Sequence, residues 1–537
     1  MAYNIADLFE RVADAVPERI ALIDRDRRLS FTELDEAANR IGHHLAANGI
    51  GPGDHVGIYG HNSEQWVETM LGCFKIRAIP INVNFRYVAD ELAYIFDNAQ
   101  LVGLVFDRQF APLVEEIADR VPKLRCMVHV EDDSDADTDS LGSVAWDDAV
   151  GAASPERDFA ERSPDDLYVL YTGGTTGMPK GVMWRQEDVF MALGGGIDAL
   201  SGVRVDDDTT LAKKASDNPF PLVFMVIPPL MHGAAQWGTL GQLFQGNTIV
   251  LLPRFSAETA WTLIDKEGVN ASIITGDAMA RPMIEHLDED PGRYDTSSVI
   301  SLSSSAAIFS PTVKDRFLER FPNLIITDSI GSSESGFNGV RIVGKGQTQL
   351  GGGPTVTPGP DVVVLDEDLV PIPPDSDQIG KLGRGGNIPL GYFNDEAKTA
   401  TTFVTASDGR RYAVSGDFAQ WEPDGTLTLL GRGSTTINTG GEKVHPEEVE
   451  QAIKDHPAVY DCIVVGVPDE RWGQTVAVVV QFREGMEATV EELADHARTF
   501  IAGYKVPRQL TAVAEIVRSP SGKPDYPWAT RIAKGES

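Results

Sequence analysis

Short runs of β-branched and aliphatic residues alternate with longer amphipathic segments through much of this chain. Residues 56–59 and 101–106 have the length and composition of buried strands, and segments with helical periodicity lie between them. The sequence Ser30-Phe31-Thr32-Glu33 predicts a helix start, because the serine can accept from the first turn while the glutamate reaches back. This alternation favours an α/β fold built on a doubly wound sheet.

The alternation continues through the middle of the chain and then changes character. Residues 271–275, 299–302 and 324–327 predict strands, and Ser310-Pro311 predicts a helix to about residue 321, because proline suits the first helical turn. From 359 to 430, valine and leucine runs broken by Gly, Pro and Asp predict a small β-subdomain. A polar stretch over 431–436 and an α+β pattern follow. We expect a large N-terminal domain over 1–430 and a small C-terminal α+β domain over 431–537.

The composition indicates a folded protein with a strongly acidic surface. Of 537 residues, 42% are hydrophobic and 23% are charged, and 46 basic against 80 acidic residues give a net charge of −34. That charge disfavours nonspecific nucleic-acid binding. Cys73, Cys126 and Cys462 lack the spacing of metal ligands or of a disulfide framework. We expect no signal peptide and no membrane-spanning helix, which favours a cytoplasmic enzyme.

The most informative segment runs from Leu170 to Gly181 and reads LYTGGTTGMPKG. Its glycines let backbone N–H groups turn inward, and its threonine hydroxyls and lysine suit the phosphates of a nucleotide. The segment is not a Walker A loop, because Pro179 precedes Lys180 and Gly181 replaces the hydroxyl residue that would hold magnesium. A glycine-rich surface turn is the alternative.

This loop closely resembles that of the acyl-adenylate-forming enzymes, the superfamily of acyl-CoA synthetases, nonribosomal adenylation domains and luciferases. The resemblance implies an ATP-phosphate site formed by Thr172, Gly173, Gly174, Thr175, Thr176, Gly177 and Lys180. Further landmarks of the superfamily follow in order along the chain.

Two of these landmarks resemble the adenine-binding segments. The small residues Ser305, Ala306 and Ala307 resemble the loop that lines one face of adenine. The segment Ile330-Gly331-Ser332-Ser333-Glu334 stands where the superfamily usually has Tyr-Gly-x-Thr-Glu. The resemblance implies that Ser333 contacts the phosphate region and that Glu334 holds magnesium. Isoleucine in place of tyrosine at 330 would give adenine an aliphatic face with weaker stacking.

The remaining landmarks lie near the expected domain junction and beyond it. Asp417, in Ser-Gly-Asp, resembles the acid that accepts from both ribose hydroxyls, and Arg432 resembles the junction arginine that also reaches the nucleotide. The following hinge position, usually charged, is Ser434. The loop of Gly440, Gly441 and Glu442 resembles the one that faces the site during thioester formation. Lys523 resembles the lysine that enters the site for adenylation.

Two residues are candidates for the acyl site. His232, in PPLMHG, occupies the superfamily's histidine position beside that site. Trp237 lies near the position where a tryptophan guards the acyl tunnel of long-chain members, although the spacing is one residue longer. Glycines and alanines around Trp237 favour a long or bulky apolar acid over acetate. Both side chains could instead be ordinary core residues.

The resemblance implies an acyl-CoA synthetase that works in two steps. A carboxylate attacks the α-phosphorus of ATP and releases pyrophosphate, and the thiol of coenzyme A then displaces AMP. Thr172, Lys180, Glu334 and Lys523 would be the catalytic residues, ATP, magnesium and coenzyme A the cofactors and cosubstrates, and the small domain would rotate between steps. Residues 177–188 resemble actinobacterial fatty-acyl-CoA synthetases, a group that includes ligases of steroid side-chain carboxylates.

Two alternatives stay open. The chain could be an acyl-AMP ligase that loads the phosphopantetheine of a carrier protein, although no carrier region accompanies it. It could also be a non-catalytic nucleotide-binding relative, which the departures at Ile330 and Ser434 would suit. The exact acid, and whether the chain forms a homodimer, are not specified by these motifs.

Overall fold

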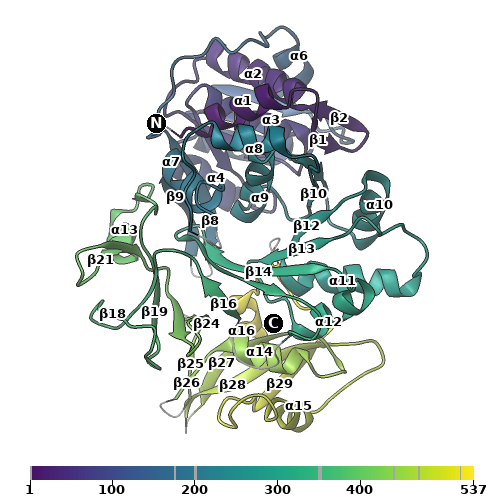
Figure 1. The fold of residues 1–537 in the computed structure, drawn as a ribbon, viewed down its shortest axis with the longest axis vertical. Helices are drawn as coiled ribbons and strands as arrows, with labels where there is room; N and C mark the ends of the chain where they lie inside the picture. The colour runs from purple at the N-terminus through teal and green to yellow at the C-terminus, as the bar shows by residue number, and fades with distance from the viewer. Residues whose placement is uncertain are drawn as a thin grey trace. The chain divides into compact units, whose positions relative to one another are not determined.

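The computed structural model describes residues 3–174, 177–198, 202–348, 354–433, 435–439, 442–469, 472–519 and 522–536. The chain divides into two compact units (Figure 1). Unit 1 comprises Met1–Ile273, Tyr294–Val299 and Asn387–Thr401. Unit 2 comprises Ile274–Arg293, Ile300–Gly386 and Thr402–Ser537.

Unit 1 contains a parallel sheet with helices on both faces. Its strands, in spatial order, are β4 (Ile79–Asn82), β3 (His55–Tyr59), β5 (Gly103–Asp107), β6 (Cys126–Val130) and β7 (Val144–Ala145). Leu104 and Phe106 join the apolar cluster under α4 (Ala89–Asn98) and α5 (Ala111–Ile117). Val105 joins the opposite cluster, with α2 (Phe31–Ala47), α3 (Glu64–Lys75) and α6 (Trp146–Gly151). Neighbouring residues of one strand thus bury on opposite faces, so the expected doubly wound sheet is confirmed.

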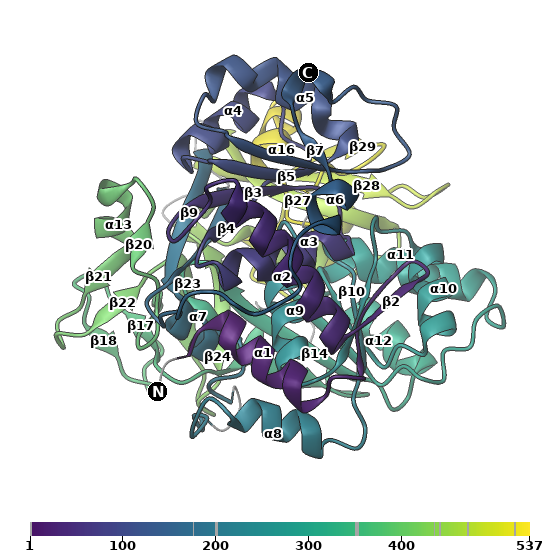
Figure 2. The same ribbon diagram turned by 90° about the horizontal axis from the view of Figure 1, so that it is seen from above.

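A second sheet of unit 1 orders β12 (Ala271–Ile274), β10 (Val223–Val226), β11 (Thr248–Leu251) and β1 (Ile20–Asp24) in parallel, with β2 (Arg27–Ser30) antiparallel at the edge. Helices α1 (Ile5–Ala15), α2 and α3 pack side by side (Figure 2). The other elements of unit 1 are β8 (Leu167–Gly174), β9 (Gly177–Arg185), α7 (Gln186–Leu193), α8 (Thr210–Asp217), α9 (Gly233–Phe244), α10 (Ala257–Glu267), β20 (Gly391–Tyr392) and α13 (Glu396–Thr402).

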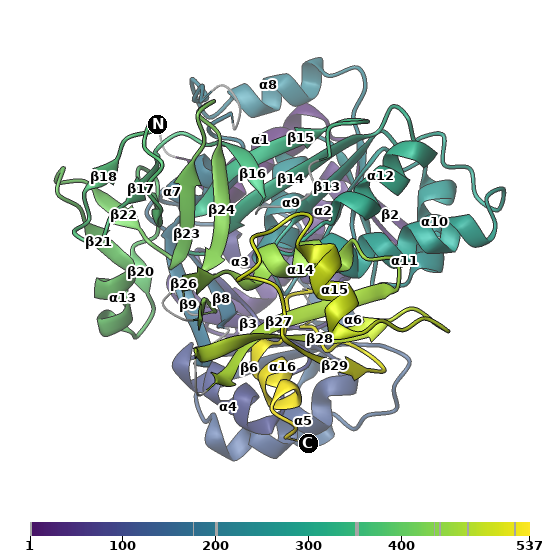
Figure 3. The ribbon, with the colours of Figure 1, turned by 90° about the horizontal axis from the view of Figure 1, so that it is seen from below.

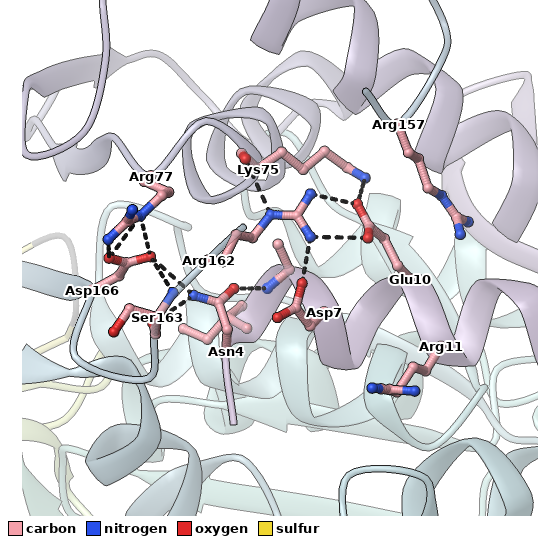
Figure 4. A network of polar contacts seen from close by, with 12 residues as sticks. Asn4, Asp7, Glu10, Arg11, Lys75, Arg77, Arg157, Arg162, Ser163 and Asp166 are labelled. Carbon is pink, nitrogen blue, oxygen red and sulfur yellow. Dashed lines mark hydrogen bonds and ion pairs between the residues drawn. The ribbon is translucent and has the colours of Figure 1, made fainter. Parts of the chain in front are cut away.

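A buried ion network joins three segments of unit 1 (Figure 4). Lys75, at the end of α3, is fully buried, and its Nζ donates to Glu10 at 2.6 Å and to Asp35 at 2.7 Å. Arg162 donates two hydrogen bonds to the Glu10 carboxylate, at 2.9 and 2.8 Å, and one to the Lys75 carbonyl at 3.1 Å. The network therefore fixes the segment before β8 against α1 and α3.

Unit 2 contains a mixed sheet with the order β18-β17-β19-β23-β24-β16-β15-β14-β13. Helices α11 (Gly276–Glu289) and α12 (Pro311–Arg320) accompany it. The strands are β13 (Ser301–Ser305), β14 (Ile325–Ser332), β15 (Gly336–Val343), β16 (Thr355–Pro358), β17 (Val362–Leu365), β18 (Pro371–Ile372), β19 (Gly380–Arg384), β23 (Asp417–Trp421) and β24 (Leu427–Arg432). β22 (Arg411–Ala413) pairs with β19, and β21 (Phe403–Thr405) pairs with β22. The β-rich region expected over 359–430 is confirmed.

The C-terminal part of unit 2 is the expected α+β layer (Figure 3). Its sheet orders β26 (Glu442–Val444), β25 (Ile437–Thr439), β28 (Gly473–Phe482) and β27 (Val459–Asp469), with β29 (Gln509–Val513) beside β28. Alternate residues of β27 and β28 bury against α14 (Pro446–Lys454) and α15 (Val490–Ala497) on one face and against α16 (Tyr526–Ala533) on the other.

Some element boundaries agree with the predictions made from short sequence motifs, and others do not. Ser30 caps α2 through the expected box, with Glu33 N donating to Ser30 Oγ at 3.2 Å and Ser30 N donating to Glu33 Oε2 at 2.7 Å. The strand expected over 299–302 instead runs over Ser301–Ser305, because its hydrogen-bonded pairing with β14 begins at Ser301. Among the described helices, none is both long and apolar enough to cross a membrane. The domain boundary at 430/431 stays a prediction.

Candidate functional site

The glycine-rich segment joins two antiparallel strands of unit 1. β8 ends at Gly174 and β9 begins at Gly177, and Gly173 and Gly174 form the last part of β8. The ladder places Thr172 directly opposite Lys180, so the two candidate phosphate ligands share one position along the hairpin. Thr175 and Thr176 lie outside the described residues.

Lys180 has an acidic partner within unit 1. Its Nζ donates to Asp395, and it lies 5.9 Å from the centre of the Tyr392 ring. The hydrogen bond from Lys180 is the main cause of a lowered pKa at Asp395. A nucleotide phosphate would therefore compete with Asp395 for this lysine.

Two buried asparagines, which the sequence motifs did not reveal, hold the loops around this hairpin. Asn82, at the end of β4, donates to the carbonyls of Tyr171 at 2.8 Å and Met231 at 2.7 Å. Asn62 donates to the carbonyls of Pro228 and Leu252 and accepts from Leu230 N at 2.6 Å. The loop before His232 is thus hydrogen-bonded at both ends to the first sheet.

His232 and Trp237 lie at the start of α9. His232 is the residue before the first turn and is half-buried, while Trp237 is buried with its ring edge-on to Tyr168 at 5.4 Å. Gly233 packs closely on β8, because a Cβ at this position would lie 2.5 Å from Leu170 Cδ2. Close packing of α9 on β8 therefore brings the two candidate acyl-site residues beside the glycine-rich hairpin.

In unit 2, two of the predicted nucleotide segments meet. β13 and β14 are parallel, and their ladder pairs Ser305 with Ser329, the residue before Ile330. Both segments therefore emerge at the same carboxyl edge of the sheet, where ligands of parallel α/β sheets commonly bind. Ala306 has a positive φ of 69°, which turns the chain sharply after β13. Ala307 follows, with its N–H donating to Ser305 O at 2.9 Å.

The start of α11 holds this small-residue loop, and the motifs did not reveal that either. Gly276 N donates to Ser304 Oγ at 3.2 Å, and Asp277 N donates to Ile308 O at 2.8 Å. The Asp277 carboxylate accepts from Ser310 N at 2.8 Å. Asp277 also pairs with the buried Arg281 at 3.0 Å. The conformation of residues 304–310 is thus set by one helix end.

The turn that carries Glu334 is tightly built. Gly331 packs so closely that a Cβ would lie 2.3 Å from the Gly336 carbonyl oxygen. Ser332 Oγ accepts from Ser335 N at 3.1 Å, which closes the turn over Ser333 and Glu334. Glu334 and Ser333 are half-buried on it. This places a carboxylate and several hydroxyls in one short turn.

Asp417 and Arg432 are direct partners in the β23–β24 ladder. Gly416 before Asp417 has φ 95°, and Ser415 Oγ donates to Asp417 Oδ2 at 2.9 Å. Next to Arg432, Gly431 leaves room for Glu447 of α14, since a Cβ on Gly431 would lie 2.2 Å from Glu447 Oε2. Burial, reinforced by Glu450, raises the pKa of Glu447 to about 8.

Lys523 is exposed on a loop that rests against α11. Its N–H donates to Ser519 Oγ at 3.0 Å, and Arg518 Nη1 donates to Gly522 O at 3.0 Å. A Cβ on Gly522 would lie 3.0 Å from Ala278 and 3.3 Å from Thr275. The Lys523 loop therefore contacts the same helix end that holds residues 304–310. Glu442 is exposed at the start of β26, while Gly440, Gly441 and Ser434 lie outside the described residues.

Family profiles and related proteins match this chain over almost its whole length. The profile of the AMP-binding enzyme family matches residues 9–393, and that of the AMP-binding enzyme C-terminal domain matches residues 448–523. The chain is 53% identical over 533 residues to the 3-oxocholest-4-en-26-oate--CoA ligase of Rhodococcus rhodochrous, covering 98% of this chain and 96% of that protein. It is 52% identical over 529 residues to the medium/long-chain-fatty-acid--CoA/3-oxocholest-4-en-26-oate--CoA ligase of Mycobacterium tuberculosis, with the same coverage.

The fold has a matching solved structure. The crystal structure of the anthranilate CoA ligase AuaEII in complex with anthranoyl-AMP superposes with a TM-score of 0.85 at 22% identity, covering 99% of this chain and 98% of that one. This likeness supports the α/β architecture with its small C-terminal part. Together with the family profile, which spans more than half of the chain, it leads to one conclusion: the chain belongs to the AMP-binding enzyme family.

Proposed function

We propose that the chain is an AMP-forming acyl-CoA ligase whose substrates are medium- and long-chain fatty acids and steroid side-chain carboxylates such as 3-oxocholest-4-en-26-oate. The observation that carries the proposal is 53% identity across 98% of the chain to a 3-oxocholest-4-en-26-oate--CoA ligase. A relative named as a fatty acid--[acyl-carrier-protein] ligase is only 28% identical, which favours coenzyme A as the thiol. Use of ATP and coenzyme A suits a cytoplasmic location, because both occur there as free pools.

Open space beside α9 supports a bulky apolar acid. A Cβ on Gly238 would meet nothing closer than 3.7 Å, with Ile273 and Phe224 as its nearest neighbours, and a Cβ on Gly241 would meet nothing within 4 Å. An apolar ligand gains about 25 cal/mol per Å² of surface that it removes from water. We propose that the acyl chain or steroid rings use this space and that Trp237 and His232 border it.

For the first step, we propose that the glycine-rich hairpin and Lys523 supply alignment and positive charge around ATP. A carboxylate is a weak nucleophile toward a polyanion, so the catalytic requirement is to hold the reactants in line and offset their repulsion. Thr172 and Lys180 would bind the phosphates from the hairpin. Ser305–Ala307 and Ile330–Ser332 would enclose adenine, and Ser333 would contact the phosphate region. Asp417 would accept from the ribose hydroxyls, and Arg432 would reach the nucleotide.

Glu334 fits the role of a magnesium ligand. Magnesium in nucleotide sites usually binds one or two protein carboxylates and otherwise phosphate and water oxygens. The turn at 332–335 offers one half-buried carboxylate among serine hydroxyls, an oxygen-only donor set of that kind. When bound, the ion would neutralise phosphate charge, while Lys523 aligns the α-phosphoryl group.

For the second step, we propose that the thiol of coenzyme A attacks the acyl carbon and releases AMP. A thiol with a pKa of about 8.5 is partly ionised at neutral pH, so a dedicated base is not required. Gly440, Gly441 and Glu442 would face the site in this step, with the C-terminal domain rotated about the segment after Arg432.

The test is a panel of carboxylic acids with the purified chain, ATP and magnesium. Acetate, octanoate, palmitate and 3-oxocholest-4-en-26-oate are compared by AMP release with coenzyme A, with a phosphopantetheinylated carrier protein, or with neither thiol. The proposal predicts coenzyme A-dependent AMP release that is greatest for the longer and steroidal acids. Preference for the carrier would identify an acyl-carrier ligase, and absence of acid-dependent pyrophosphate release would identify a non-catalytic relative.

Lys523→Ala tests the division of labour between the steps. The variant should lose acid-dependent pyrophosphate release but keep thioester formation from a supplied acyl-adenylate, because only the first step needs a cation at the α-phosphate. Equal loss of both steps would remove the role proposed for Lys523.

A further inference from the structure

One face of α11 receives contacts from the C-terminal part of unit 2 along its length. At its first turn, Thr275 and Ala278 lie against Gly522, next to Lys523. Further along, Arg281 and Glu285 are four residues apart and so share one face of the helix. Arg281 contacts Tyr460 of β27, and Glu285 contacts Arg483 of the segment after β28.

The central contact is an aromatic ring between two arginines. The Tyr460 ring centre lies 5.7 Å from Arg281 Cζ and 5.8 Å from Arg483 Cζ. Arg483 Nη1 also donates to Glu285 Oε1 at 2.8 Å. The C-terminal part is thus held to α11 by the Arg483–Glu285 ion pair and by the Arg281–Tyr460 cation–π contact, while Arg483 packs on the same ring from within the C-terminal part.

These contacts are of a kind that can separate at low cost. Glu285 and Arg483 are 27% and 31% exposed, and ion pairs at such exposure are weak. Arg316 of α12 lies 3.4 Å from the same Glu285 oxygen, so the carboxylate keeps a cation after Arg483 leaves. A partly open cavity of about 90 Å³, whose lining includes Arg281, Val313, Arg316, Lys454, His456 and Arg483, leaves the region incompletely packed.

The basic lining of that cavity does not make it an anion site. Arg281 is paired with Asp277, Arg316 with Asp288, Lys454 with Asp461, and Arg483 with Glu285. Each cation is already neutralised by a carboxylate. The arrangement is therefore that of a polar contact surface.

The contacts are also linked to the candidate adenine loop. Arg281 Nη2 donates to Asp277 Oδ2 at 3.0 Å, and the other Asp277 oxygen accepts from Ser310 N. A movement of Tyr460 would therefore change the packing around Arg281, the residue that hydrogen-bonds to Asp277. One helix connects the Lys523 loop, the Tyr460 contact and residues 304–310.

We propose that Arg281, Glu285, Tyr460 and Arg483 form a releasable dock that seats Lys523 for adenylation and parts before thioester formation. The four are positioning residues that act through Lys523. The proposal rests on the proposed function, because it assigns the contact to one of the two half-reactions of that enzyme. It predicts that weakening the dock slows the first half-reaction and spares the second.

The decisive variant is Arg483→Glu, which places a carboxylate against Glu285 and removes one cation from Tyr460. Replacing the exposed Arg483–Glu285 ion pair by repulsion between two carboxylates corresponds to about a tenfold shift in the docked population. Acid-dependent pyrophosphate release should therefore fall about tenfold in kcat, with KM for ATP and acid within about twofold of the parent. Thioester formation from supplied acyl-adenylate should be unchanged or faster.

Arg498→Glu is the matched control, because it makes the same charge change on α15, where Arg498 pairs with Asp495. It should leave both half-reactions unchanged. Glu285→Gln provides a second, milder variant with the same expected split, should Arg483→Glu not fold. Equal slowing of both half-reactions, or no slowing of either, would overturn the dock while leaving the proposed function standing. Absence of coenzyme A-dependent AMP release from the parent chain would overturn both.

Discussion

The contact between α11 and the candidate adenine loop, residues 304–310, can be tested with the variant Gly276→Ala. This variant is a more specific test than a substitution within the loop itself, because it leaves the loop residues unchanged. Gly276 has φ 52°, and a Cβ there would lie 2.3 Å from Ile308 O and 2.8 Å from Ala307 O. The added methyl group must push residues 307–308 away from α11. Gly268 offers a matched control, since it has a similar φ of 62° but open space around an added Cβ.

The two variants are expected to lose different amounts of folding stability. A left-handed backbone costs alanine about 1–2 kcal/mol, and this cost applies at both positions. At Gly276 the displaced loop also loses the hydrogen bonds from Asp277 N to Ile308 O and from Gly276 N to Ser304 Oγ, each with a net value of about 0.5–1.5 kcal/mol. Gly276→Ala should therefore lose about 1–3 kcal/mol more stability than Gly268→Ala, and this extra loss comes from the displacement of residues 304–310. If adenine rests on that loop, about tenfold weaker ATP binding follows, since 1.4 kcal/mol is a factor of ten.

The assays are denaturant unfolding and the KM for ATP in acid-dependent pyrophosphate release. Gly268→Ala should lose about 1–2 kcal/mol of stability with an unchanged KM for ATP. Gly276→Ala should lose more stability and raise the KM about tenfold at an unchanged KM for the acid. An unchanged KM for ATP in Gly276→Ala, with the extra loss of stability observed, would show that residues 304–308 do not bind adenine.

Three further predictions concern stability, pH and acid size. Lys75→Met should destabilise unit 1 by about 3 kcal/mol in urea unfolding, because Glu10 and Asp35 each lose the buried lysine as a partner; a loss below about 1 kcal/mol would mean that Arg162 and Arg157 are sufficient partners for the two carboxylates. Glu447 has a pKa raised by burial to about 8, so folding takes up a proton, and the free energy of unfolding should fall as pH rises from about 5 to 8. Glu447→Gln should flatten that fall in urea titrations at several pH values, and an unaltered pH profile would contradict the assignment. Gly238→Leu should lower kcat/KM for the steroid acid more than for octanoate, while Gly238→Ala, whose Cβ would make only an ordinary van der Waals contact at 3.7 Å from Ile273, should not; equal effects on both acids would place the space beside Gly238 outside the acyl site.

The parts of the fold that were predictable are those whose signal is local. The box at Ser30 sets the start of α2 by hydrogen bonds between residues three apart. The start of α12 follows Ser310 without a side-chain cap hydrogen bond and has Pro311 in its first turn, where the fixed φ of proline suits a helix. The bounds of β13 were not predictable, because they depend on its pairing with β14 more than twenty residues later. A strand made largely of serine has little intrinsic preference for extended structure.

The same distinction applies to the candidate site. The phosphate, magnesium and ribose candidates were visible because each is a contiguous group of small, hydroxyl and charged residues. Asn62, Asn82 and Asp277 were not visible, because each is a single polar residue whose partners are distant in sequence. Asn82 meets Met231, 149 residues away, and Asn62 meets Leu252, 190 residues away. Only the fold reveals which carbonyls they satisfy.

Oxygen transfer tests the acyl-adenylate most directly. With the carboxylate oxygens of the acid labelled with ¹⁸O, attack on the α-phosphorus followed by thiolysis leaves one labelled oxygen in AMP. We expect one ¹⁸O atom in AMP per acyl-CoA formed and none in pyrophosphate, measured by mass spectrometry of a coenzyme A-dependent reaction with 3-oxocholest-4-en-26-oate. Label in a cleaved phosphate or in pyrophosphate, or unlabelled AMP beside labelled acyl-CoA, would contradict the reaction assigned to this chain.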